Sequence, residues 1–242
     1  QFIKRKQLKE AVNYGGCDPS LGGDKIVLTH LQGKDWTVEK EGKKIEYSRR
    51  HIREQVEIKI PEGTKNPGDY VAAEYVKFCK QRNIGYQNAA LDVIGIGQAS
   101  LEGCQRLGFM VQPFRAGSTT GVRTLDDKRI EQRIDKDGEQ KGQRLFDNIR
   151  SQNFYDMAAA TSEGMLTFDE QLEESIYDNL ATELEAHGYD AKGSMIVVDK
   201  KNDGANSIQS RLGHSPDYAD SLQTAWWVSK KRNYSIKQLV SI

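Results

Sequence analysis

The first 60 residues have the hydrophobic and polar pattern of a β-sheet. Apolar residues come in short runs bounded by turn residues, which predicts four strands: 11–17, 24–33, 35–45 and 51–60. The first strand leads into the Asp18-Pro19 turn, and the second returns from that turn as the partner of a hairpin. Pro61 ends the fourth strand, because proline cannot donate to a strand ladder. The chain therefore opens with a β-meander.

After residue 65 the apolar positions recur with a helical period. Val71, Tyr75 and Cys79 share one face of a predicted helix that is capped by Asn66 or Asp69. The elements that follow are strands at 86–95, 109–117 and 194–201 and helices at 98–107, 145–161 and 169–187. This alternation predicts an α/β fold with a mixed sheet flanked by helices.

A closing helix is expected near the end of the chain. Ser215 is placed to cap it, Pro216 suits its first position, and the pattern continues to about Lys230. Asp217 and Asp220 are three residues apart and so share one helical face. We expect Asp217 to be the more exposed of the two and Asp220 to lie one turn deeper, toward the sheet.

Two further aspartates follow strands, and all four are candidate metal ligands. Asp18 ends the first strand and Asp92 ends the strand at 86–95, so both belong at the sheet edge where ligands bind in such folds. Carboxylates about 4 Å apart repel by roughly 4 kcal/mol at an effective dielectric near 20. Oxygen ligands favour Mg²⁺ or Mn²⁺, and two such ions side by side hydrolyse phosphodiesters. Asp18, Asp92, Asp217 and Asp220 are therefore the predicted metal ligands and catalytic residues.

Three motifs containing these aspartates resemble a known family. They are GGCDPSLGGDK, LDVIGIGQASLEGCQRLGFMVQPFRAG, and GHSPDYADSLQTAWW followed by SKKRNY. They are similar to the C-terminal nuclease domain of the terminase large subunit of tailed bacteriophages, which has an RNase H-like (integrase superfamily) fold. The resemblance covers most of residues 10–229. It implies that Asp18 and Asp92 are strand-borne ligands and that Asp217 and Asp220 complete the site from the helix.

The same resemblance implies a biological setting. The activity would be cleavage of concatemeric double-stranded viral DNA during genome packaging, either headful or site-directed. Residues 1–242 are expected to be a single nuclease domain from a longer protein, because the chain begins with Gln1 and contains no G-x-x-x-x-G-K-[ST] phosphate loop. The implied partners are double-stranded DNA, the N-terminal ATPase domain, a portal protein and a small terminase subunit, in the host cytoplasm, with oligomers only in the full-length motor.

Charge and composition add constraints. Lys and Arg total 35 and Asp and Glu total 35, so DNA binding would have to depend on local basic patches. No run of 18 apolar residues and no signal peptide is present, so a membrane role is not expected. Three cysteines without paired spacing indicate reduced thiols and no zinc site. Residues 118–144 are charged with almost no aliphatic period, which predicts a surface insertion or flexible arm.

Basic residues near the expected site could contact phosphate, although each could also be an ordinary solvated side chain. One lysine pair ends the strand at 194–201, a histidine borders the acidic helix, and further basic residues lie in or near the charged stretch. The candidates are Lys200, Lys201, His214, Arg115, Lys128 and Arg129, followed by Arg133, Lys141 and Arg144.

Two other classes of protein stay open. An RNase H-like enzyme of the resolvase or transposase type would share the acids, and cleavage of linear duplex without junction preference would argue against a resolvase. A non-catalytic DNA-binding or docking module would not cut plasmid in Mn²⁺. A dinucleotide site at Gly95-Ile96-Gly97 is disfavoured, because Ser100 stands where the third glycine is required.

Overall fold

A computed structural model describes residues 2–3, 10–20, 25–40, 42–118, 146–192, 195–202 and 204–239. The strands are β1 (Phe2–Ile3), β2 (Val12–Asp18), β3 (Ile26–Lys40), β4 (Lys43–Ile58), β5 (Ala89–Asp92), β6 (Gln112–Phe114), β7 (Leu166–Asp169), β8 (Tyr189–Lys192) and β9 (Met195–Val198). The helices are α1 (Pro67–Gln81), the short 3₁₀ turn η1 (Tyr86–Asn88), α2 (Gly97–Arg106), α4 (Ile149–Ser162), α5 (Glu174–Glu185), α6 (Ile208–Leu212) and α7 (Asp217–Leu239).

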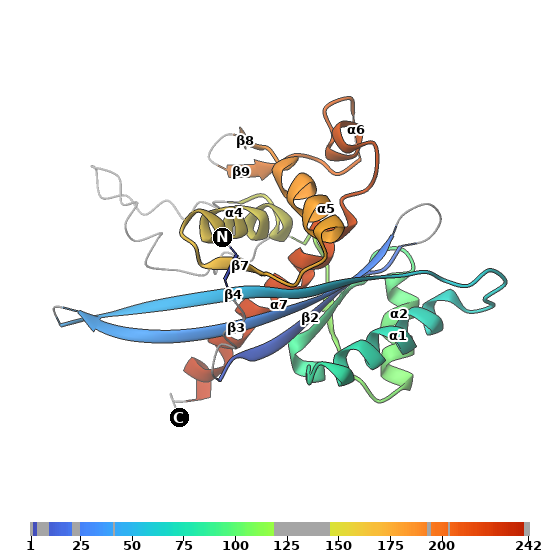
Figure 1. Ribbon diagram of the computed structural model, residues 1–242, viewed down its shortest axis with the longest axis horizontal. Coiled ribbons are helices and arrows are strands. Elements are labelled where there is room, and N and C mark those ends of the chain that lie inside the picture. The colour runs from blue at the N-terminus through green and yellow to red at the C-terminus, as the bar shows by residue number, and fades with distance from the viewer. Residues whose placement is uncertain are drawn as a thin grey trace.

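Seven strands form one mixed sheet in the order β1-β7-β4-β3-β2-β5-β6 (Figure 1). β3 is antiparallel to both β2 and β4, while β5 is parallel to β2 and β6 is parallel to β5. Parallel neighbours need a crossover, and the helices α1 and α2 lie in the connections that lead to β5 and β6. The predicted α/β class, a mixed sheet flanked by helices, is confirmed.

The two faces of the sheet are covered by different helices. Ile26 and Leu28 of β3 belong to a core cluster with α1 and α2, whereas Val27 and Leu31 belong to a second cluster with α4, α5 and α7. Figure 1 shows α1 and α2 on one side of the sheet and α4 and α5 on the other. Because successive side chains on a strand point to opposite faces, alternate residues of each strand contact α1 and α2 on one side or α4, α5 and α7 on the other.

The predicted strands at 24–33, 35–45 and 51–60 are in fact the two long strands β3 and β4. Gly33, the last residue of the strand predicted at 24–33, lies inside β3. A Cβ there would lie 2.8 Å from the Tyr14 ring and 2.9 Å from Cδ of Arg50, so the glycine permits close packing. The hairpin turns instead at Gly42, whose φ of 73° is the left-handed conformation that glycine adopts easily. β3 and β4 extend past the other strands of the sheet and project as a two-stranded arm (Figure 1).

Other elements also differ from the prediction. The sequence pattern missed β7, β8 and α6, and β9 pairs with β8 outside the main sheet. β7 has four residues, the shortest run over which alternation can indicate a strand, and all four are buried. The helix expected from 169 begins at Glu174. The closing helix continues past Lys230 to Leu239.

Some predictions fall on residues that the structure does not describe. The charged stretch 118–144 lies outside the described residues except for Ser118, and so do Lys128, Arg129 and the other basic candidates of that stretch. In the described part of the chain, no helix is both long and apolar enough to cross a bilayer. The three cysteines are buried free thiols.

Candidate active site

Two of the four aspartates are neighbours at the carboxyl ends of parallel strands. Cys17 of β2 pairs with Leu91 of β5, so the next residues, Asp18 and Asp92, end the two strands side by side. Asp18 is four residues after Tyr14 on the same strand, so both side chains point to the same face of the sheet, and Tyr14 packs there in the core cluster that includes α7. The same alternation on β5 brings Asp92 to this face. Both carboxylates therefore lie on the side of the sheet that α7 covers.

A glycine allows α7 to approach this sheet edge closely. A Cβ on Gly16 would lie 2.3 Å from the carbonyl oxygen of Ser221 and 2.5 Å from the backbone nitrogen of Ala225. The Ser221 hydroxyl lies 2.9 Å from the carbonyl oxygen of Val27, to which it donates a hydrogen bond. The backbone of α7 thus lies directly against β2, and its first turn carries two more aspartates to the strand ends.

These two aspartates are both buried, and each has a different partner. The expectation that Asp217 is the more exposed is wrong, because it is 3% exposed and Asp220 is 8% exposed. The backbone N–H of Lys25 donates to Asp217 Oδ2 at 2.7 Å, which joins the start of α7 to the start of β3. Asp220 Oδ2 lies 2.8 Å from Nζ of Lys201. Asp217 therefore has a structural contact besides any catalytic role.

The aspartates disfavour one another's ionisation. Burial raises the pKa of Asp18 well above its usual range; Lys201 opposes this change, while Asp220, Asp92 and Asp217 add to it. Burial also raises the pKa of Asp92 to about 6, although the N–H of Ile94 donates to its Oδ1 at 3.1 Å and acts in the opposite direction. A cation bound among these groups would reverse the balance and favour their charged forms.

Two basic residues accompany Asp220. Burial by itself would raise the pKa of Asp220, but Lys201 and then Arg150 outweigh it, so the pKa is below its usual range. Within the described residues, no three Asp, Glu, His or Cys side chains are close enough to hold one metal ion as they lie. The cation that the acids hold in this arrangement is the Lys201 ammonium.

The donor set nevertheless fits a hard divalent cation. The four aspartates supply only oxygen, as Mg²⁺ and Mn²⁺ prefer. Asp18 Oδ2 is buried and has no hydrogen-bond partner among the described residues. Buried polar atoms are almost always paired, so this acceptor suits a cation or a water as its partner.

Comparison with solved structures found nucleases. The chain is similar to a phage terminase nuclease. The crystal structure of the large terminase nuclease from thermophilic phage G20c is 14% identical with a TM-score of 0.46, and the match covers 90% of this chain and 83% of that chain. The structure of the same nuclease with bound magnesium is also 14% identical, with a TM-score of 0.42 and coverage of 90% and 82%. No family model and no curated protein sequence matches the chain.

The described basic candidates differ in their contacts with the acidic residues. The ion pair to Asp220 is made by Lys201, whereas Lys200 is exposed. Arg115 is exposed just after β6 and is near enough to Asp92 to lower its pKa. His214 is half exposed and its Nδ1 lies 3.9 Å from Oε1 of Glu183.

Glu183 of α5 is a site residue that the sequence reasoning missed. It takes the place of the expected cap, because its Oε2 accepts the N–H of Ala219 at 2.8 Å, while the Ser215 hydroxyl is buried with no hydrogen-bond partner in the described part of the chain. Burial raises the pKa of Glu183 to about 8, with Ala219 opposing this change and Asp217 adding to it.

Arg150 and His187 were missed as well. Arg150 donates to Nε2 of His187 at 3.0 Å, and Nδ1 of that ring donates to the carbonyl of Glu183 at 2.7 Å. This chain of contacts fixes a partly buried guanidinium near enough to Asp220 to lower its pKa. The sequence did hold a signal, because Glu183 and His187 interrupt the apolar face that Leu180 belongs to on the predicted helix.

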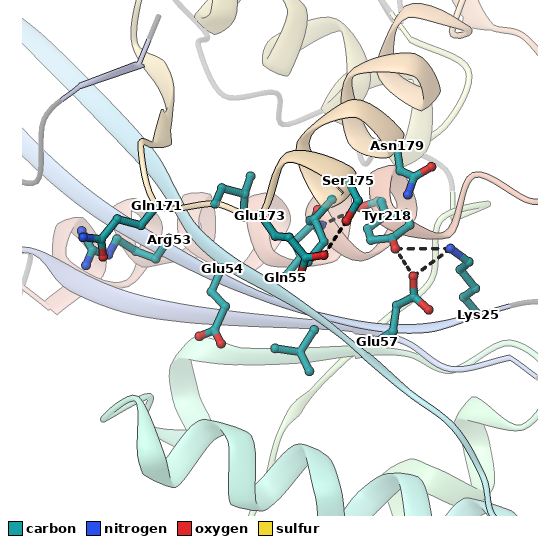
Figure 2. A pocket seen from close by; sticks show the side chains of 13 residues that line it. Lys25, Arg53, Glu54, Gln55, Glu57, Gln171, Glu173, Ser175, Asn179 and Tyr218 are labelled. Carbon is teal, nitrogen blue, oxygen red and sulfur yellow. Dashed lines mark hydrogen bonds and ion pairs between the residues drawn. The ribbon is translucent and has the colours of Figure 1, made fainter.

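A separate cavity of about 680 Å³ lies between β4 and α5 (Figure 2). Figure 2 shows Lys25, Glu57 and Tyr218 pointing toward one another at one end of it. Lys25 Nζ lies 2.7 Å from Glu57 Oε1, so this ion pair satisfies both charges. The charged residues that line the cavity are Lys25, Arg53, Glu54, Glu57 and Glu173. With more acids than bases in that lining, the cavity is a poor phosphate site, and the aspartate cluster is the better candidate.

Proposed function

We propose that this chain is a divalent-metal-dependent endonuclease that cleaves concatemeric double-stranded viral DNA during genome packaging, by two-metal-ion phosphodiester hydrolysis. The observation that carries the proposal is that Asp18, Asp217 and Asp220 are buried, and Asp92 is partly buried, where β2 and β5 end and α7 begins. Such a cluster destabilises the fold unless a cation compensates for it. The packaging role follows from the resemblance of the sequence motifs to terminase nucleases.

Asp18, Asp92, Asp217 and Asp220 would hold the ions, Mg²⁺ or Mn²⁺. When bound, these ions supply a water of lowered pKa and stabilise the charge on the departing 3′ oxygen. Asp18 and Asp92 end neighbouring strands of the central sheet, so their carboxylates have a rigid support. Arg115, exposed beside Asp92, is placed to contact a DNA phosphate.

The first test is digestion of supercoiled plasmid by the purified chain. We expect nicked and then linear product in Mn²⁺ or Mg²⁺, with little sequence preference, and no product in EDTA, because the carboxylates cannot activate water without the ion. Undiminished cleavage in chelator would rule out the metal mechanism. A strong preference for four-way junctions over linear duplex would favour the resolvase class instead.

Alanine variants of the two helix aspartates test their separate roles. We expect Asp220→Ala to lower the cleavage rate by at least about 100-fold, the scale of removing one charge-stabilising group from an active site. Asp217→Ala is expected to lower it less and also to lower the melting temperature, because it loses the hydrogen bond from Lys25. Rates are measured at low and high Mn²⁺, since excess metal partly restores a variant that lacks a ligand.

The matched control is Asp178→Ala, which removes an exposed aspartate from α5. It should cleave at the wild-type rate. If neither Asp217→Ala nor Asp220→Ala changes the rate, the start of α7 is not part of the active site.

The proposed partners are double-stranded DNA, the ATPase domain of the longer protein, a portal protein and a small terminase subunit in the host cytoplasm. In this proposal residues 1–242 are a single nuclease domain that hydrolyses no ATP by itself. DNA-stimulated ATP hydrolysis by the pure chain would contradict this division of labour.

A further inference from the structure

Lys201 forms an ion pair with Asp220 of the acidic cluster, and it comes from outside the main sheet. It lies three residues after the end of β9, and its Nζ is 2.8 Å from Asp220 Oδ2. Burial acts to lower the pKa of Lys201, but attraction to Asp220 and Asp18 outweighs burial and raises it. One ammonium is therefore attracted to two of the carboxylates that would ligate a metal.

The two cations beside Asp220 differ in mobility. Arg150 is fixed, because its guanidinium donates to the carbonyl of Asp199 at 2.7 Å as well as to His187. The Lys201 side chain is 34% exposed and ends a flexible four-carbon stem. Its backbone is anchored, since the Lys201 carbonyl accepts the N–H of Gln209 at 2.9 Å. The ammonium can therefore swing toward solvent while the backbone stays in place.

We propose that Lys201 is a displaceable internal cation, which balances Asp18 and Asp220 in the metal-free protein and competes with the divalent ion for their oxygens. An Asp220 oxygen that holds the ammonium at hydrogen-bond distance cannot at the same time take a metal ion in that direction. Binding of the ion then releases the ammonium, which becomes available to a DNA phosphate at the edge of the site. The identity of the competing ion rests on the proposed function.

The ion pair with Lys201 accounts for the orientation of the acids, whose oxygens do not point to one common metal position in this structure. Asp220 is turned to the ammonium, and Asp18 Oδ2 has no hydrogen-bond partner among the described residues. An ammonium satisfies fewer carboxylate oxygens than a divalent ion with six or more ligands does. A purely structural ion pair would instead hold its partners in place with or without metal.

The test is metal binding without DNA, measured by calorimetric titration of Mg²⁺ and Mn²⁺ into the whole chain. Lys201→Met keeps most of the length of the side chain and removes the charge. We expect its Kd for metal to fall about tenfold, a typical coupling between two ligands of one site. Lys200→Met is the matched control, because it removes the same charge from an exposed neighbour, and its Kd should equal that of the wild type. Lys201→Gln is a second neutral variant in case the methionine variant does not fold.

The outcomes separate this inference from the proposed function. A Kd in both Lys201 variants that equals or exceeds the wild-type value overturns the displacement, even if the wild type cuts DNA in Mn²⁺. A lower Kd in Lys200→Met as well would show a general charge effect and would also overturn it. If neither the wild type nor the Lys201 variants bind metal at millimolar concentration, or if Asp18→Asn binds it as the wild type does, the proposed metal site fails too.

Discussion

Asp18→Asn and Asp92→Asn are each expected to abolish DNA cleavage without destabilising the metal-free protein. Asparagine keeps the size of the side chain but removes one charge from a group of like charges. Burial raises the pKa of Asp92 to about 6 and that of Asp18 well above its usual range, so ionising either group at pH 7 opposes folding. The cleavage rate is measured with plasmid in Mn²⁺, and stability is measured by urea unfolding in EDTA.

The effect of pH gives this prediction a second readout. A carboxyl with a raised pKa in the folded state favours folding below its unfolded pKa, and this contribution is lost as the pH rises through the folded value. The rise in the pKa of Asp92 to about 6 corresponds to about 3 kcal/mol, so the stability gained by Asp92→Asn should approach that value at pH 8 and become small below about pH 4. Asp178→Asn, at an exposed position, should show no such change. If both proteins are measured in EDTA and the asparagine variants melt several degrees below the wild type, Asp18 and Asp92 are structural partners instead.

Gly16→Ala is expected to be the most damaging single methyl addition at the site. Its Cβ would overlap the backbone of α7 at Ser221 and Ala225, and backbone atoms of a packed helix cannot rotate away as a side chain can. We expect a loss of about 3 kcal/mol or more in the free energy of unfolding, the upper range for overpacking a core. Because a displaced α7 carries Asp217 and Asp220 with it, cleavage should fall even in the fraction that stays folded.

Gly117→Ala is the control, since an added Cβ at this exposed glycine meets nothing within 4 Å. Urea unfolding and the plasmid assay are applied to both variants. A Gly16→Ala protein that unfolds at the wild-type midpoint and cleaves normally would show that α7 does not depend on close contact with β2.

The sequence predicted correctly those elements in which apolar residues recur at a regular helical or strand spacing. α2 lies within one residue of its predicted bounds, 98–107, and α1 begins directly after the predicted cap Asn66, because the apolar residues of both helices recur at helical spacing. β7 was missed because its four residues are the shortest run over which alternation can indicate a strand. The strand end predicted at Gly33 was wrong because the tight contact of this glycine with Tyr14 and Arg50 exists only after folding.

The sequence by itself determined which acids stand at element ends, because strand boundaries and a helix start are local properties. Tertiary structure decided that these acids meet. Parallel pairing of β2 with β5 brings Asp18 beside Asp92, and the small size of Gly16 lets α7 deliver Asp220 to them. Tertiary structure also decided that, of the lysine pair predicted near the site, Lys201 pairs with Asp220, and that Glu183 of α5 caps the start of α7. Their placement depends on packing between segments far apart in the chain, where burial and charge act through space and leave no periodic pattern.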